Sequence, residues 1–196
     1  MAAGERLIAE RGASVPSADI VEAAGQRNRS AMQYHFGSRE ALIVAILERR
    51  LRELADRQVE LLSEHEVSGA QDSVPALLEI LVRPMFEVPY ADGSTHYARF
   101  LSQVRHLAVV SEPLQDATRW PVVNIVSHRI AAQIGHLTPP TRRRRMEALT
   151  TVMAGLLADL EQRGQQDGTE MDRSESTVLG TIAMIAGMLA APEPTV

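Results

Sequence analysis

Hydrophobic residues recur along this chain at the three- and four-residue spacing of helices that bury one side. The clearest case runs from Ser38 to about Leu62, where apolar positions fall on one face and charged residues on the other. The apolar positions are Leu42, Ile43, Ile46, Leu47, Leu51 and Leu54. The pattern predicts a long amphipathic helix that connects two parts of the protein.

Prolines and short polar stretches divide the following region into shorter helices. We expect one helix to open at Pro75 and to kink or end at Pro84, because an internal proline removes a backbone donor and crowds the preceding turn. Further helices are predicted at about residues 95–110 and 122–134, with a break at 111–113. No segment shows the alternation of a half-buried strand, so the sequence predicts an all-α fold.

The last two predicted helices are the most apolar. One opens at Pro139, and the second follows a polar loop at 164–168. The second is too apolar on all sides for a helix half in water, which leaves burial within one chain and a four-helix bundle between two chains both open. The residues assigned to such a dimer interface are Leu149, Val152, Met153, Leu156, Leu160, Val178, Ile182, Ile185 and Leu189.

Candidate chemistry concentrates between Ala23 and Arg39, which contain three arginines, one histidine and no carboxylate. Gly25 supplies the permissive backbone of a sharp turn after a short helix, and Asn28 is a suitable N-cap for the next helix. Met32 and Phe36 stand four residues apart, so they point inward together. The pattern predicts two short helices joined by a turn.

The outer face of the second short helix carries hydrogen-bonding groups, namely Arg29, Ser30, Gln33 and Tyr34. Gly37 is expected to end this helix and Ser38 to cap the next. A helix, a turn and a second helix with a polar outer face are typical of the helix-turn-helix, whose second helix enters the DNA major groove.

The charge distribution agrees with a local use for the basic residues. The chain of 196 residues has a net charge of −5, but residues 1–52 carry +2 and residues 53–196 carry −7. All twenty basic residues are Arg, so a single Arg is ordinarily a solvated surface charge, and clustering at the turn is what points to DNA. The four arginines at 142–145 are expected to form a solvated face paired with nearby acids.

Three segments taken together resemble the N-terminal signature of TetR-family transcriptional regulators: Leu7–Gly12, Ile20–Gly25 and Tyr34–Leu42. The resemblance covers about the first quarter of the chain. The turn is one residue longer than the usual pattern and lacks its apolar residue. Only six residues precede Leu7, so we expect a short first helix. Two explanations stay open for the basic arm that many relatives carry there: a truncated start or an absent arm.

The resemblance implies a DNA-binding domain at residues 1–45 and a helical ligand-binding and dimerisation domain at residues 46–196. It also implies a homodimer, whose two reading helices lie one DNA turn apart on a palindromic operator, and repression that a small molecule relieves. The residues to which DNA contact is assigned are Arg27, Asn28, Arg29, Ser30, Gln33, Tyr34, His35 and Arg39.

A small-molecule pocket is expected among the middle helices, where most of the few aromatic residues gather. An ordinary core is the alternative for the same residues. Those assigned to the pocket are Met85, Phe86, Tyr90, His96, Tyr97, Phe100, Trp120 and Val123.

Several other classes of protein are disfavoured. The chain has no cysteine, its six histidines include no pair three or four residues apart, and no phosphate-binding loop or nucleophile elbow is present. We therefore expect no enzyme, no metal and no cofactor. The charged N-terminus and the absence of a long apolar run favour a soluble cytoplasmic protein without membrane contact. The alternative function is a small-molecule-sensing or protein-interaction module without specific DNA binding.

Overall fold

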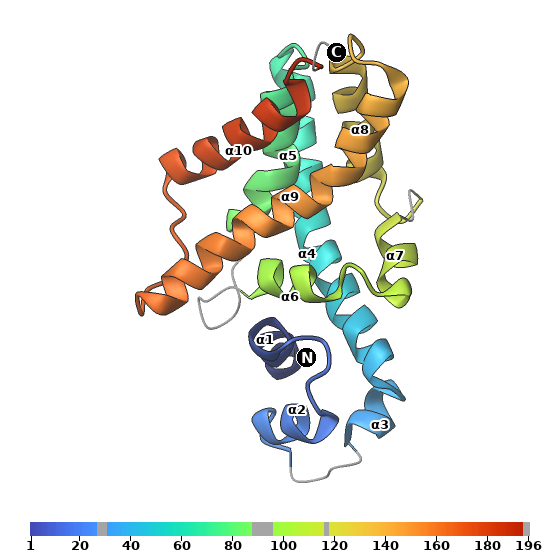
Figure 1. The fold of residues 1–196 in the computed structure, drawn as a ribbon, viewed down its shortest axis with the longest axis vertical. Coiled ribbons are helices and arrows are strands. Elements are labelled where there is room, and N and C mark those ends of the chain that lie inside the picture. Colours follow the sequence, from blue (N-terminus) through green and yellow to red (C-terminus); the bar gives the residue numbers. More distant parts are fainter. Residues whose placement is uncertain (27–30, 88–95, 116–117, 194–196) are drawn as a thin grey trace.

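The computed structural model describes residues 1–26, 31–87, 96–115 and 118–193, and these contain ten helices and no strand. The predicted all-α fold is confirmed. Figure 1 shows α1 (Ala2–Arg11), α2 (Ser17–Ala23) and α3 (Ala31–Phe36) gathered at one end of the molecule. No helix in the described ranges combines the length and apolar character needed to cross a membrane.

The long helix predicted from Ser38 is α4 (Arg39–Ser68), which runs from the α1–α3 end into the rest of the molecule (Figure 1). The Ser38 hydroxyl oxygen accepts a hydrogen bond from the Ala41 amide at 3.0 Å, which satisfies one of the free donors at the start of the helix. Its predicted apolar face is buried except for Leu51, which is half-buried. The helix continues unbroken across position 45, so the two predicted domains share α4.

The remaining helices are α5 (Val74–Glu87), α6 (Tyr97–Val104), α7 (Ala108–Gln115), α8 (Pro121–Gln133), α9 (Pro139–Gln166) and α10 (Glu175–Ala190). Of the two outcomes predicted at Pro84, a kink or an end, the end is contradicted, and the break predicted at 111–113 is wrong. The helix at Pro84 does not end there but continues to Glu87, because Met85 and Phe86 are buried and their packing offsets the lost backbone bond. The predicted break at 111–113 falls instead between Val104 and Ala108, and α7 runs through Pro113.

A buried ion pair joins α1 to α4. The Arg50 Nε atom donates to both carboxylate oxygens of Glu5, at 3.0 and 3.2 Å, and the two residues are only 3% and 1% exposed. Removing two charges from water is costly, and good hydrogen-bond geometry offsets that cost only while both partners are present. The pair therefore fixes where α1 sits on the long helix.

A second buried carboxylate positions α6. Glu161 on α9 accepts hydrogen bonds from the backbone amides of Ala98 and Arg99, at 3.1 and 2.9 Å. These amides belong to the first turn of α6, where the donors lack partners within the helix and the helix dipole favours a negative charge. Glu161 thus caps α6, although it lies more than sixty residues away in the sequence.

Arginine side chains hold α10 at both ends, through an ion pair at its start and through hydrogen bonds to backbone carbonyls at its end. At its start, the Arg83 guanidinium on α5 donates to both oxygens of Glu175, at 2.9 and 2.7 Å. At its end, the Arg145 side chain donates to the carbonyl of Leu189 at 2.8 Å and to that of Ala191. A cation at the carbonyl end of a helix is favourable, so Arg145 has a structural role that the prediction of a solvated face for 142–145 did not include.

We expect Arg50→Met to lower the free energy of unfolding by about 3–5 kcal/mol, because it removes the guanidinium that faces the buried Glu5 carboxylate. Denaturant unfolding measures this change. The matched control is Arg163→Met, since Arg163 pairs with Asp159 at 2.8 Å on the exposed side of α9. The control should change stability by less than about 1 kcal/mol. Equal effects of the two substitutions would contradict the role of the buried pair.

Candidate functional site

The helix α3 presents a polar, exposed face at the end of the molecule. Gln33, Tyr34 and His35 are exposed, and the Tyr34 side chain retains 85% of its accessible surface. Met32 and Phe36 are half-buried and pack against the hydrophobic core, as the four-residue spacing predicted. The same short helix therefore has an anchored face and a free face.

Two glycines define the ends of the segment that contains α3. After α2, the amide of Gly25 donates to the Glu22 carbonyl and that of Gln26 to the Val21 carbonyl, which closes the helix in a left-handed turn. Gly25 and Gly37 have φ of 67° and 76°, values that favour glycine. The glycine predicted to open the turn and the predicted end of the second short helix are both confirmed.

Four of the residues assigned to DNA, Arg27, Asn28, Arg29 and Ser30, lie outside the described residues. The last assigned residue, Arg39, opens α4 and lies 3.8 Å from the Glu40 carboxylate. The pKa of the Glu40 carboxyl lies below its ordinary value, because the Glu40 backbone amide and the Ser38 side chain donate hydrogen bonds to it. The positive charge of Arg39 lowers this pKa as well. The charge of Arg39 is therefore partly balanced by a neighbouring carboxylate.

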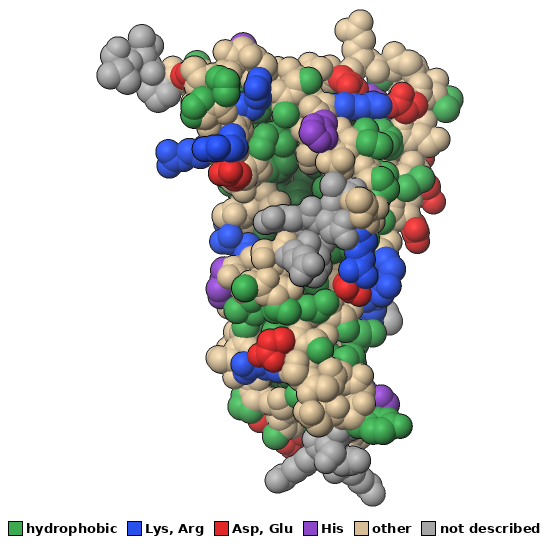
Figure 2. Space-filling view, turned by 90° about the vertical axis from the view of Figure 1, so that its right-hand side faces the viewer, with side chains coloured by type: hydrophobic (Ala, Val, Ile, Leu, Met, Phe, Trp, Pro, Cys, Tyr) green, Lys and Arg blue, Asp and Glu red, His purple; other side chains and the backbone are tan. Residues whose placement is uncertain are grey.

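Away from α3, charges of both signs share the surface. On the face drawn in Figure 2, basic and acidic side chains lie interspersed, with hydrophobic side chains exposed between them. Such a face offers no extended field of one sign to a polyanion.

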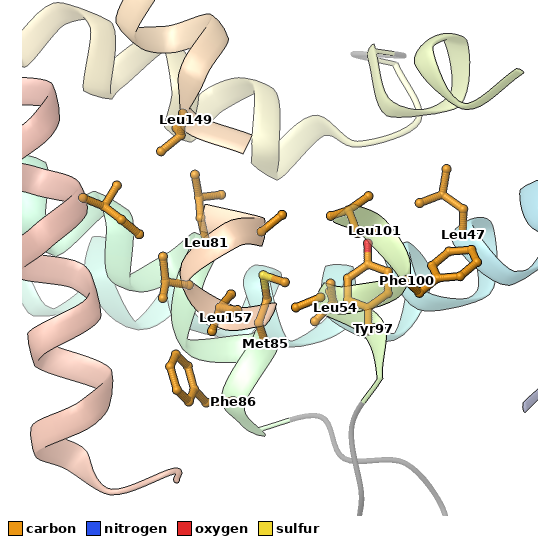
Figure 3. Close-up of a cluster of buried hydrophobic side chains, with 14 of the residues drawn as sticks. Leu47, Leu54, Leu81, Met85, Phe86, Tyr97, Phe100, Leu101, Leu149 and Leu157 are labelled. Atoms are coloured by element: carbon orange, nitrogen blue, oxygen red, sulfur yellow. The ribbon is translucent and has the colours of Figure 1, made fainter. Parts of the chain in front are cut away.

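A cavity of about 310 Å³ lies in the larger part of the molecule, between α4, α5, α6, α8 and α9. Figure 3 shows part of its wall, with Leu54 from α4, Leu81 and Met85 from α5, Tyr97 and Leu101 from α6, and Leu149 from α9. Exposed polar residues of α9, Glu147, Thr150 and Thr151, also line it. The cavity has a mostly apolar wall with a few polar groups, which is the usual composition of a small-molecule site.

The cavity includes about half of the residues assigned to a pocket from the sequence. Met85, Tyr97, Trp120 and Val123 line it. Phe86 and Phe100 do not line it, because they are buried in the core. His96 does not line it either, and its imidazole Nδ1 lies 2.8 Å from the Arg99 guanidinium. Tyr90 lies outside the described residues. Sequence analysis missed the contribution of α4, namely Leu51, Leu54 and Gln58. The two leucines were assigned to the apolar face of a connecting helix, and Gln58 was not assigned to any site.

The residues assigned to a dimer interface divide into two groups. Leu149, Val178, Ile182, Ile185 and Leu189 are buried inside the protomer, so as they stand they offer no surface to a second copy. Val152, Met153, Leu156 and Leu160 are half-buried. The exposed large residues of α10 are instead Leu179 and Met184, at 48% and 56%. Because α10 is apolar on all sides, its sequence pattern did not distinguish the inward face from the outward one.

Tyr97 connects the cavity to the buried charges. Burial raises the pKa of its hydroxyl above the ordinary value, Glu5 raises it further, Arg50 lowers it, and Glu161 raises it. The same residue lines the cavity. Tyr97 therefore lines the cavity and is also close enough to Glu5, Arg50 and Glu161 for their charges to act on its hydroxyl.

Within the described ranges, no group of three or more His, Asp or Glu side chains is arranged to hold a metal ion. The conspicuous polar features are instead the exposed face of α3 and the cavity.

The raised pKa of Tyr97 predicts a specific loss of stability in alkali. Above about pH 10 the unfolded chain ionises this tyrosine while the folded chain keeps it protonated, so stability falls by up to about 1.4 kcal/mol per pH unit. Below that pH both states are protonated and the residue contributes no pH dependence. Urea unfolding between about pH 9 and 12 should therefore show a shallower decline for Tyr97→Phe than for the wild type.

The control for this measurement is Tyr34→Phe, whose ring is exposed in the folded state. It should keep the wild-type pH dependence. An unchanged decline in Tyr97→Phe would contradict the assignment of the buried phenol.

Comparison of the sequence with models of known protein families gives no match, and a search of curated proteins gives none. The functional interpretation therefore depends on the residues themselves and on their geometry.

Proposed function

We propose that this chain is a sequence-specific DNA-binding transcriptional regulator, similar to TetR-family proteins, that acts in the cytoplasm as a homodimer on a palindromic operator. A small molecule that enters the cavity releases it from DNA, so its basal action is repression. The observation that carries the proposal is α3, a short helix that follows a glycine turn and is anchored by Met32 and Phe36 with Gln33 exposed. Glutamine is suited to this role because its amide makes paired hydrogen bonds to adenine.

The dimer is supported by the outward face of α10. Leu179 and Met184 are exposed there, and Gly180 and Gly187 leave open space beside them. Small residues between large apolar ones permit close helix approach. A two-fold dimer through these helices presents two copies of α3, as a palindromic operator requires.

The arrangement of α4 supports coupling between the cavity and DNA. Leu51, Leu54 and Gln58 of this helix line the cavity, while two residues separate its first residue, Arg39, from the end of α3. Suppose that a ligand prefers a conformation in which the two α3 helices are wrongly spaced for DNA. It then lowers DNA occupancy only to the extent that it binds this conformation more tightly than the DNA-binding one. A hundredfold preference corresponds to about 2.7 kcal/mol.

Footprinting on DNA that flanks the gene for this chain, over a salt series, tests the proposal. We expect a protected near-palindrome. Gln33→Ala should weaken binding roughly tenfold to hundredfold, because one paired base contact is worth about 1–3 kcal/mol. Arg29→Ala should have a similar effect. The matched control is Gln133→Ala, since Gln133 is exposed at the end of α8.

Diffuse protection that salt erases and that neither Gln33→Ala nor Arg29→Ala changes would reject α3 as the reading helix. The protein would then be better described as a sensing or interaction module without specific DNA binding.

The dimer is tested by Met184→Arg, which introduces a charge into the proposed apolar interface. We expect the wild type to sediment as a dimer and this variant as a monomer, with loss of protection over the palindrome. Val67→Arg is the matched control, because Val67 is also exposed but lies near the end of α4. A wild-type monomer, or a Met184→Arg dimer, would contradict the proposed interface.

A further inference from the structure

Gln58 is a largely buried polar residue on the wall of the cavity. It lies on α4 and is 7% exposed. Its amide makes no hydrogen bond to any residue in the described ranges, and its atoms are not among the fully buried unpaired ones, so the amide keeps contact with open space. A glutamine side chain has two donor hydrogens and an acceptor oxygen, and buried groups of this kind are nearly always paired. The amide is therefore available to a molecule inside the cavity.

The Tyr97 hydroxyl is a second such group. It reaches the same cavity from α6, and Figure 3 shows its oxygen beside Leu101. It too makes no hydrogen bond within the described part of the chain. Gln58 and Tyr97 thus lie on different helices at one cavity, whose wall is mostly apolar but also includes Ser111 and Ser127. A ligand that satisfies both would have a hydrogen-bonding group attached to an apolar body.

The ionic groups of the cavity wall are not buried. Arg105 and Glu147 are exposed, and Arg105 donates to the Thr151 hydroxyl at 2.9 Å. The buried charges nearby, Arg50 and Glu161, are engaged by Glu5 and by the first turn of α6, and they do not line the cavity. A charged ligand group beside Gln58 would therefore lose its hydration without meeting an opposite charge.

We infer that the cavity binds an uncharged molecule with a compact apolar body and a carboxamide-like group, which pairs with the Gln58 amide and the Tyr97 hydroxyl. A volume of about 310 Å³ is at the lower end of ligand sites, so the molecule is small. The role of this molecule as the releasing ligand depends on the proposed function, whereas its binding does not.

A series of probes with one apolar body tests the inference: adamantane-1-carboxamide, adamantane-1-carboxylate, 1-(aminomethyl)adamantane and 1-methyladamantane. None of them absorbs where tryptophan does. Trp120 is the only tryptophan and lines the cavity, so its emission reports binding there. We expect the carboxamide to bind at least about tenfold more tightly than the carboxylate and the amine, which corresponds to about one net hydrogen bond.

Gln58→Met keeps the length of the side chain and removes its amide. It should lower the affinity for the carboxamide, relative to that for 1-methyladamantane, by about tenfold. Gln133→Met makes the same chemical change at an exposed site and should leave all affinities unchanged. Tyr97→Phe provides a second test should Gln58→Met fail to fold, and it should shift the same ratio in the same direction.

Three results would overturn the inference: no probe changes the Trp120 emission, a charged probe binds as tightly as the carboxamide, or the folded cavity variants keep the wild-type selectivity. Because these titrations contain no DNA, they are independent of the footprint. Selective binding without a footprint would leave the cavity assignment standing and reject the regulator, and a footprint without selective binding would do the reverse.

Discussion

The ion pair between Glu5 and Arg50 is the contact on which the arrangement of the N-terminal helices depends. It buries a charge from α1 against a charge from α4, and each is favourable only while the other is present. Beside it, Glu161 fixes the start of α6 from α9. Tyr97 senses all three charges. Two helix pairs, α1 with α4 and α6 with α9, are therefore each held by a buried polar contact within an otherwise apolar core.

These buried contacts give the proposed regulator a physical path between its two sites. The cavity wall contains Tyr97 and three residues of α4. The ion pair between Glu5 and Arg50 holds α1, which packs against α2 and α4, the two helices that precede and follow α3. A ligand that moves α4 relative to α6 has to disturb buried charges, which tolerate few arrangements. Such contacts favour two distinct arrangements of the helices over a continuous range of arrangements. Ligand-controlled release from DNA requires two such conformations, one that binds DNA and one that does not.

Strong local signals made much of the fold predictable. The α4 stripe, the glycine turns at Gly25 and Gly37, and the inward spacing of Met32 and Phe36 are all features of neighbouring residues. What the sequence did not reveal depends on distant partners. Glu5 and Arg50 read as ordinary surface charges until the fold brings them together, Gln58 read as part of a connecting helix, and the uniformly apolar α10 had no recognisable inward face. Packing, not local preference, also carried α5 through Pro84.

Hydrogen exchange of the backbone amides, measured with an operator duplex and with an unrelated duplex of equal length, tests the central claim most directly. If α3 reads DNA from the end of α4, operator DNA should slow exchange at residues 31–39 more than the unrelated duplex does, since specific contacts hold that segment in place. Equal exchange at residues 31–39 with both duplexes, or selective slowing at residues 142–145 instead, would contradict it.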